Sequence, residues 1–481
     1  MSTKFSDRLQ VLRPLCAGAA LFFLILFQFV LRLQYGPGGA LASADSAKFV
    51  RIAIEGGLPH TPLFPLYTLL LRVFSHLKFL YEPGANLSLL SAILVSFGCV
   101  FLWDALSRRF KDRFFTFFAV LAVSFLPFIV MAATEVTPVS LSICLFFFAY
   151  AVLVNESIPL YFKFIPCGLL AFHDPLALWF FAIILPFASF LFFKAGKGKA
   201  FVSGVLLALI VGLLPYLYAA FVFGKGESCE YLRREDLWKS LFCAVLNGQF
   251  WSNYFVLPLS GYGASFIDTC RAFFISSALS LFVIPVLLLG LFFRKAKKFA
   301  TLENTTAVAA LLATLLFCVP SFHFYIAQWF WLINAYLAVF LACSFIYISK
   351  AKEMRLLLCP LLFIGILVMS VHSFDHVPAR RSAFEAAKLA QAFGTLPYES
   401  VLVTGDVYTD GEYYRYHLAV HPKLVSKNIA VMDEVVPGKR NFFISPAVKG
   451  FLEEQNVPFH LVSDVDGLAV YELGRSIEGE K

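Results

Sequence analysis

The sequence contains no Cys-x-x-Cys pair and no Gly-rich nucleotide-binding loop, and each absence argues against a class of site. Without paired cysteines, a zinc centre or a thiol redox motif has little support. Without the Gly loop in its short basic segments, a cytosolic site for ATP or a nucleotide sugar is disfavoured. There is no internal repeat, no low-complexity tract and, after residue 372, no cysteine that could form a disulfide.

Apolar residues, by contrast, make up 60% of the 481 residues, with 57 Phe and a mean hydropathy of +0.78. A soluble chain would have roughly 45–50% apolar residues, so the composition indicates a membrane protein. The net charge of +8 does not indicate nucleic-acid binding, because Lys and Arg form short clusters between apolar runs, as in cytoplasmic loops. Most cysteines lie inside apolar runs and are expected to pack as small hydrophobic side chains. Only Cys229, Cys243 and Cys270 share a predicted outer loop and leave room for one bridge.

Segments of about the length that crosses a bilayer predict eleven transmembrane helices. They lie at 14–34, 83–104, 113–133, 137–154, 159–173, 175–193, 200–223, 272–293, 305–322, 326–349 and 355–372. Ala42-Ser43-Ala44 is similar to a signal-peptide cleavage site. The first apolar run is longer than a signal peptide needs, which favours an uncleaved anchor.

The basic clusters predict the orientation of the chain. With eleven spans, the amino terminus and the clusters 108–113, 194–199, 294–298 and 350–355 all fall on one side, which is predicted to be cytoplasmic. The carboxyl terminus is then outside. The outer face receives the loops 35–82 and 224–271, the turn at Glu135, the pair His173-Asp174 and the stretch 321–325.

A change of composition near residue 373 divides the chain into a transmembrane part, 1–372, and a soluble domain, 373–481. A linker followed by an amphipathic helix is expected in 372–396, and helices are expected in 412–420 and 445–455. Short strands are expected at 401–406, 428–435, 441–445 and 468–473. Alternating strands and helices predict a small α/β domain on the outer side.

The most informative segment follows the first span. Asp45 opens a short amphipathic stretch, which leads to a Gly-Gly turn, then to His60 and to a run of aromatic residues spaced by prolines. An acidic residue at the mouth of a span is costly unless it has a function or a partner. The pattern resembles the first outer loop of GT-C superfamily glycosyltransferases, in particular the branch related to transmembrane protein O-mannosyltransferases. The shared residues are Asp45, Ser46, Gly57, His60, Pro62, Pro65, Leu66 and Tyr67, while Thr61 and Leu63 replace the usual Pro and Gly.

The resemblance implies an α-helical polytopic membrane protein of GT-C type with about eleven transmembrane helices and a small C-terminal α/β domain. It also implies an inverting glycosyltransferase that uses a polyprenyl- or dolichyl-phosphate sugar. The acceptor would be a hydroxyl of a protein or glycan on the outer or lumenal face, in a bacterial inner membrane or the endoplasmic reticulum. Mannose is the sugar that the family suggests, although no residue here selects it.

The same resemblance makes Asp45 the catalytic base, a role that suits a carboxylate near the acceptor hydroxyl. Asp45 would also serve as a helix N-cap before Ser46. Lys48 and Arg51 follow about one turn apart and could hold the lipid phosphate, or they could snorkel to lipid headgroups. His60 is either a substrate contact or a structural hydrogen-bonding residue.

Two further segments resemble the family. Glu135 lies in an Ala-Thr-Glu-Val turn and would bind sugar or acceptor, unless it is a surface turn residue. His173 and Asp174 form an ionisable pair at a span end, which is costly without a role. Asp45 is followed by Ser46 and Ala47, so no Asp-x-Asp pair exists and no metal or other cofactor is predicted. The alternative that Glu135, His173 or Asp174 holds a divalent ion is left open.

Other polar groups carry weaker signals. Arg233, Arg234 and His323 lie on the predicted outer side, and Thr404-Gly405-Asp406 is interpreted as a turn at a strand end. The alternative function is a transporter or flippase, which would need charged groups near the membrane midplane and repeat symmetry. The predicted spans are almost free of charge and no two halves match. A third class is a non-catalytic membrane scaffold that presents the C-terminal domain. Intact function of the Asp45→Asn variant would favour this class.

Overall fold

The computed structural model describes residues 2–35, 44–55, 64–80, 83–223, 331–348, 364, 383–404, 414–415, 418–419, 422–432, 435–444, 458–465 and 468–473. Apart from residue 364, the predicted spans at 272–293, 305–322 and 355–372 lie outside these residues. Cys229, Cys243 and Cys270 also lie outside them, as do Arg233, Arg234 and His323.

Within this part the chain is mostly helical. The helices that precede the C-terminal domain are α1 (Ser2–Tyr35), α2 (Ala44–Glu55), α3 (Pro65–Ser75), α4 (Pro83–Phe110), α5 (Arg113–Ser124), α6 (Pro127–Thr134), α7 (Val139–Val154), α8 (Leu160–Lys163), α9 (Ile165–His173), α10 (Pro175–Lys194), α11 (Gly198–Phe223) and α17 (Trp331–Ile348).

Four described helices are long and apolar enough to cross a membrane, at Cys16–Leu33, Pro83–Phe110, Leu176–Lys194 and Gly198–Pro215. The predicted span 113–133 is not one straight helix: the chain there forms two helices, α5 and α6, with a bend of 70° between them. Pro127 begins α6 and cannot donate a backbone hydrogen bond to the preceding turn, which ends the first helix. Counted as one bent span, this pair is a fifth.

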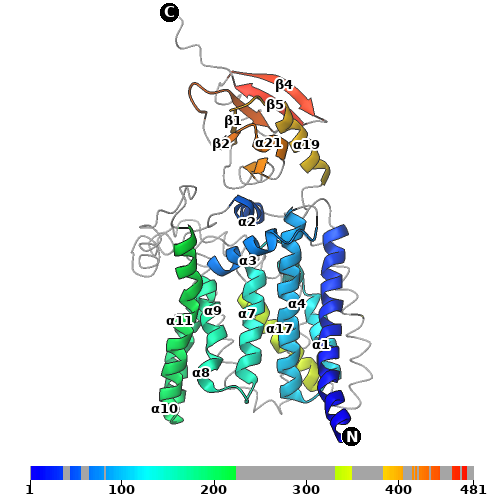
Figure 1. Cartoon of the computed structure of the whole chain (residues 1–481), viewed down its shortest axis with the longest axis vertical. Helices are drawn as coiled ribbons and strands as arrows, with labels where there is room; N and C mark the ends of the chain where they lie inside the picture. The colour runs from blue at the N-terminus through cyan, green and yellow to red at the C-terminus, as the bar shows by residue number, and fades with distance from the viewer. Residues whose placement is uncertain are drawn as a thin grey trace, which may run out of the picture.

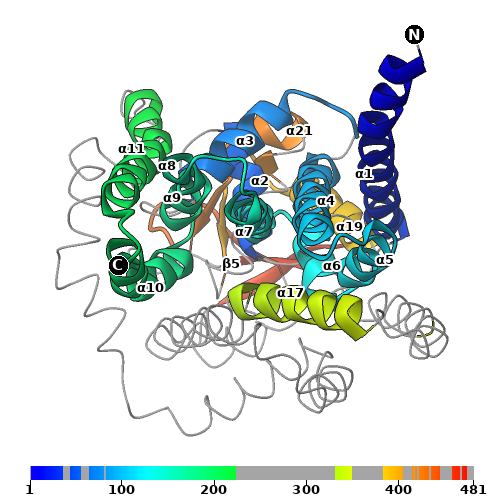
Figure 2. The ribbon, with the colours of Figure 1, turned by 90° about the horizontal axis from the view of Figure 1, so that it is seen from below.

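The helices stand side by side in the order α1, α4, α7, α9 and α11, with α17 against the bundle near α5 and α7 (Figures 1 and 2). The inner pair, α4 and α7, is close: a Cβ on Gly98 would lie 3.0 Å from the Cα of Cys144. The amphipathic helix α2 and the short helix α3 lie across one end of the bundle, opposite the end where α1 begins (Figure 1). The C-terminal sheet lies beyond them at that same end.

The C-terminal domain contains helix and sheet, as predicted. Its elements are α19 (Ala383–Thr395), β1 (Val401–Val403), α21 (Pro422–Val425), β2 (Ala430–Met432), β3 (Asn441–Ile444), β4 (Phe459–Val465) and β5 (Leu468–Leu473). The strand order is β2-β1-β3-β5-β4, with β1 parallel to β2 and β3, and with β5 antiparallel to β3 and β4.

Four of these strands coincide with predicted strands, and α19 coincides with the predicted amphipathic helix. The sequence prediction missed β4, which lies at the edge of the sheet and is largely exposed. An exposed edge strand has no alternating apolar face, so its sequence carries little signal. The predicted helix at 445–455 lies outside the described residues.

Candidate functional site

Helix α2 places the first group of predicted site residues across the end of the bundle that faces the C-terminal sheet (Figure 1). The helix begins at Ala44, so Asp45 lies in its first turn and not at the cap position expected before Ser46. A first turn also suits an acidic residue, since this end of the helix dipole is positive. The side chain of Asp45, and the whole of His60, lie outside the described residues.

The two basic residues of α2 are partly buried. Arg51 donates to Glu55 one turn later, with 3.1 Å between Nη1 and Oε2. Lys48 lies almost one turn before Arg51 on the same helix. A guanidinium carries five N–H groups, so the bond to Glu55 uses only part of the hydrogen-bonding capacity of Arg51. Such a partly exposed ion pair stabilises the fold by about 0–1 kcal/mol.

The chain enters α3 through a sharp turn at Phe64. This residue has a left-handed backbone (φ 63°, ψ 38°), which is rare for a bulky side chain. The amide and hydroxyl of Thr68 both donate to the carbonyl of Phe64, at 3.0 and 3.1 Å. The turn directs the Phe64 ring against His173, with 5.5 Å between ring centroids, and against Phe49 of α2, at 6.3 Å.

The last residue of the family-like pattern, Tyr67, is fully buried. Its hydroxyl lies 3.2 Å from Oγ of Ser91, and Ser140 is a further hydrogen-bonding neighbour. Burial raises the pKa of Tyr67, and the negative charge of Glu135 adds to this shift. The first outer loop therefore packs directly on the turn that carries Glu135.

Glu135 lies between α6 and α7. Its backbone is extended (φ −109°, ψ 155°) and its amide donates to Met131 at 3.1 Å, so α6 ends at this point. The side chain is only 3% exposed, which differs from a solvated turn residue. Two residues on, the carbonyl of Thr137 accepts from the hydroxyl of Ser140 at 2.8 Å, which holds the start of α7.

His173 is the last residue of α9 and is buried. Its Nε2 lies 3.2 Å from the carbonyl oxygen of Pro138 in the α6–α7 turn. A carbonyl only accepts, so Nε2 carries the proton and Nδ1 is an acceptor. Among the described residues Nδ1 has no hydrogen-bond partner. His173 thus joins the α6–α7 turn to the first outer loop.

Asp174 follows between α9 and α10 and is also buried. Oδ1 accepts from the amide of Leu176 at 2.9 Å and caps α10, while Oδ2 lies 2.7 Å from the hydroxyl of Ser142. That hydroxyl also lies 3.3 Å from the carbonyl of Pro138, but it has one proton, and the closer carboxylate takes it. Burial raises the pKa of Asp174 to about 6, and the hydrogen bonds act against this shift.

The structure thus brings together the first outer loop, the turn at Glu135 and the junction at His173 and Asp174. No group of three or more His, Cys, Asp or Glu in the described part of the chain is placed to hold a metal ion. Thr404 directly follows β1, and its amide donates to the carbonyl of Met432 at 2.9 Å, as expected next to a strand end. Gly405 and Asp406 lie outside the described residues.

Sequence reasoning missed two residues near this site. Ser142 supports Asp174 from within an apolar helix, and serine in a predicted span could have been taken as a signal. Trp331 begins α17, is 1% exposed and packs on Phe146, with 6.2 Å between ring centroids. The indole is near enough to Asp174 to lower its pKa, but its N–H makes no hydrogen bond of normal geometry within the described residues. No local sequence signal distinguishes Trp331 from the other aromatic residues around it.

The sequence matches no protein-family model and none of the curated proteins. The fold is similar to solved structures of ArnT from Cupriavidus metallidurans. The structure bound to undecaprenyl phosphate has a TM-score of 0.59 at 12% identity, over 98% of this chain and 99% of that one. The apo structure has a TM-score of 0.57 at 12% identity, over 94% and 97%. The chain therefore has the GT-C membrane fold, with a small C-terminal α/β domain, as the resemblance in its first outer loop predicted.

Proposed function

We propose that this chain is an integral membrane glycosyltransferase that moves a sugar from a polyprenyl- or dolichyl-phosphate donor to an acceptor hydroxyl. The observation that carries the proposal is the packing of the family-like first loop on the other two family-like segments. Phe64 contacts His173, and Tyr67 lies beside the Glu135 turn. The likeness in fold to ArnT, solved with undecaprenyl phosphate, supports a lipid-phosphate donor.

The chemistry follows from where such a donor lies. Its lipid stays in the bilayer, so the anomeric carbon is at the membrane surface, where α2 crosses the end of the bundle. Asp45 accepts the proton of the acceptor hydroxyl as that oxygen attacks the anomeric carbon, with inversion. Lys48 and Arg51 stabilise the negative charge that grows on the departing phosphate.

The buried residues position the reactants in this proposal. Glu135 and His173 bind the sugar or the acceptor, and His60 contributes a further contact from the first outer loop. Asp174 and Ser142 position His173, because their hydrogen bond of 2.7 Å ties the α9–α10 junction to α7. Mannose is the sugar to test first, with a protein or glycan acceptor on the outer or lumenal face.

Replacing Asp45 by Asn tests the assignment of the base. Asn keeps the shape of the side chain but cannot accept a proton, so transfer should fall by about 10²–10⁴-fold. Asp45→Glu should also be slow, because a displacement of about 1 Å can cost about 10²-fold. The measurement is transfer from polyprenyl-phosphate mannose in purified membranes, together with binding of that donor.

Asp104→Asn is the matched control. Asp104 lies near the end of α4 that is remote from α2, and its Oδ2 pairs on the surface with Nε of Arg108 at 2.9 Å. It should leave transfer unchanged. Asp45→Asn should still fold and bind the donor. Turnover close to that of the unaltered protein in Asp45→Asn would remove the base assignment and favour a scaffold or transport role.

A further inference from the structure

The hydroxyl of Tyr67 lies where three segments of the site meet. Tyr67 belongs to α3, and its hydroxyl oxygen lies 3.2 Å from Oγ of Ser91 in α4. Ser140, in the first turn of α7, is a second side chain that hydrogen-bonds to this hydroxyl. All three residues are fully buried. A buried hydroxyl costs free energy unless it is hydrogen-bonded, so these contacts hold the end of the ring in place.

The direction of these hydrogen bonds follows from the number of protons. The hydroxyl of Ser140 donates to the carbonyl of Thr137 at 2.8 Å, and a hydroxyl has only one proton to give. Ser140 therefore accepts from Tyr67, and Tyr67 in turn accepts from Ser91. The four residues form one chain of hydrogen bonds, which runs from α4 through α3 to the α6–α7 turn. In such a chain each bond polarises the next, so that the bonds strengthen one another.

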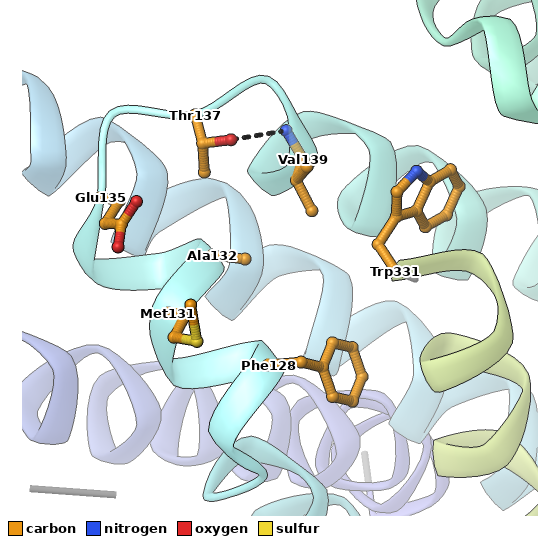
Figure 3. Close-up of a pocket in the computed structure, with 7 residues that line it drawn as sticks. All are labelled: Phe128, Met131, Ala132, Glu135, Thr137, Val139 and Trp331. Atoms are coloured by element: carbon orange, nitrogen blue, oxygen red, sulfur yellow. Dashed lines mark hydrogen bonds between the residues drawn. The ribbon is translucent and has the colours of Figure 1, made fainter. Parts of the chain in front are cut away.

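The chain of hydrogen bonds ends on the turn that carries Glu135. Thr137 lies two residues after Glu135, and its own hydroxyl accepts from the amide of Val139 at 3.4 Å (Figure 3). The carboxylate of Glu135 is close enough to act electrostatically on the hydroxyl of Tyr67. The ring of Tyr67 packs on Phe49 of α2, with 5.5 Å between ring centroids. Tyr67 thus contacts α2 through its ring and reaches the Glu135 turn through its hydroxyl.

We propose that Tyr67 is a positioning residue, whose hydroxyl holds the Glu135 turn in a fixed position relative to α2. This inference rests on the proposed function, in which α2 carries the base and Glu135 binds the sugar or the acceptor. The two groups come from different segments, so their spacing depends on contacts between those segments. Apolar packing has no preferred direction, whereas a hydrogen bond does, and the hydroxyl of Tyr67 supplies that direction.

Tyr67→Phe tests this role, because it removes the hydroxyl and keeps the ring against Phe49. The value of kcat/KM for transfer should fall by between about 5-fold, the equivalent of one lost hydrogen bond, and about 10²-fold, which a displacement of about 1 Å can cost. Binding of sugar-free polyprenyl phosphate should stay the same, because the cations proposed to hold the phosphate lie on α2, outside the chain of hydrogen bonds. Ser140→Ala breaks the same chain and should show the same pattern.

The double variant Tyr67→Phe/Glu135→Gln separates positioning from a general structural role. A residue that acts through Glu135 has little left to act on once the carboxylate is gone. The loss of kcat/KM in the double variant should therefore be smaller than the product of the two single losses, by about 2- to 150-fold for residues in one network. Losses that multiply would overturn the proposal, and so would an unchanged kcat/KM in Tyr67→Phe.

Tyr150→Phe is the matched control. The hydroxyl of Tyr150 accepts from Nη1 of Arg109 at 3.0 Å near the other end of α7, so its removal should leave transfer unchanged. All variants are assayed well below their thermal midpoints, so that reduced stability alone does not lower the rate. An equal loss of transfer in Tyr67→Phe and Tyr150→Phe would indicate a general effect on the fold and would overturn the proposal.

Hydrogen exchange gives a readout that does not need turnover. The amides of Glu135 and Ser140 are hydrogen-bonded at the two ends of the turn, at 3.1 and 3.2 Å, and they exchange when these bonds open. Both amides should exchange faster in Tyr67→Phe than in the unaltered protein, and at the unaltered rate in Tyr150→Phe. Faster exchange in a protein that transfers no sugar would remove the proposed function and leave the hold of Tyr67 on the turn standing. Unchanged exchange in Tyr67→Phe would overturn the proposal, whatever the activity.

Discussion

At the scale of single residues, the site contains a buried carboxylate held by neutral donors. Asp174 accepts from the hydroxyl of Ser142 and the amide of Leu176, and no described Lys or Arg pairs with it. Neutral donors offset only part of the cost of burying a charge. The protonated form is therefore favoured in the folded protein, which is why its pKa is raised to about 6 from 3.8.

This shift predicts a pH dependence of stability. Below its unfolded pKa, Asp174 is protonated in both states and contributes nothing to the pH dependence. As the pH rises from 3.8 to about 6, the unfolded state loses its proton first, so the free energy of unfolding falls. Asp174→Asn removes this dependence and keeps a capping residue. The variant should gain thermal stability relative to the unaltered protein between pH 4 and pH 7, measured in detergent without substrate.

Asp112→Asn is the control for a change of capping residue. Asp112 caps α5 by accepting from the amide of Phe115 at 3.1 Å, and it is only half-buried. For each variant, the measured quantity is its thermal midpoint minus that of the unaltered protein. From pH 4 to pH 7 this difference should grow more for Asp174→Asn than for Asp112→Asn. A difference that stays constant from pH 4 to pH 7 would contradict the pKa assigned to Asp174.

At the scale of elements, the helices pack through small residues. Gly204, Ala208 and Gly212 recur every four residues on α11 and so share one face. A Cβ on Gly212 would lie 2.7 Å from the carbonyl oxygen of Gly168 in α9, and a Cβ on Gly168 would overlap the carbonyl of Ala208. In a membrane, where apolar burial between helices adds little, such close backbone approach drives association. This crossing holds α9, and with it His173, in place.

Gly168→Ala should therefore destabilise the protein, because the added methyl has no room and must push α9 away from α11. Overpacking of this kind costs about 1–3 kcal/mol. The measurement is the thermal midpoint in detergent. Gly394→Ala in α19 is the control, since a Cβ there meets nothing within 4 Å. Equal midpoints for the two variants would show that the crossing tolerates the methyl group.

At the scale of the whole molecule, the chain separates two kinds of surface. The start of α1 and the α4–α5 and α10–α11 connections lie at one end of the bundle, and the latter two carry the basic clusters 108–113 and 194–199 (Figure 1). The helices α2 and α3 and the C-terminal sheet lie at the other end. A bias of basic residues to one end is typical of the cytoplasmic side, so we propose that the sheet is outside.

Reporter fusions test this orientation. A reporter that is active only outside should be silent when fused after residue 200 and active when fused after residue 480. A fusion after residue 80, in the first outer loop, is the control and should report the same side as residue 480. Activity at residue 200 and residue 480 alike would contradict both the eleven-span count and a shared outer site.

The sequence by itself determined the membrane class, most helix positions and the family-like first loop. These depend on local properties: a span is a run of apolar residues, and the pattern from Asp45 to Tyr67 is contiguous. Helices α10 and α11 accordingly lie close to their predicted bounds, whereas α1 begins well before its predicted span and α4 continues past the end of its own. The same local signals failed where they are weak, at the exposed edge strand β4, and where a proline bends the chain between α5 and α6.

Only the tertiary structure decided which side chains meet. Tyr67 lies beside Glu135, His173 bonds to Pro138 and Asp174 bonds to Ser142, although each pair is separated by more than 30 residues. Trp331 reaches the same region from α17, much further along the chain. These contacts depend on how helices cross, and the crossing distances depend on small residues such as Gly98 and Gly168. Periodicity and hydropathy describe each helix alone, so they carry no information about which face of one helix packs on another.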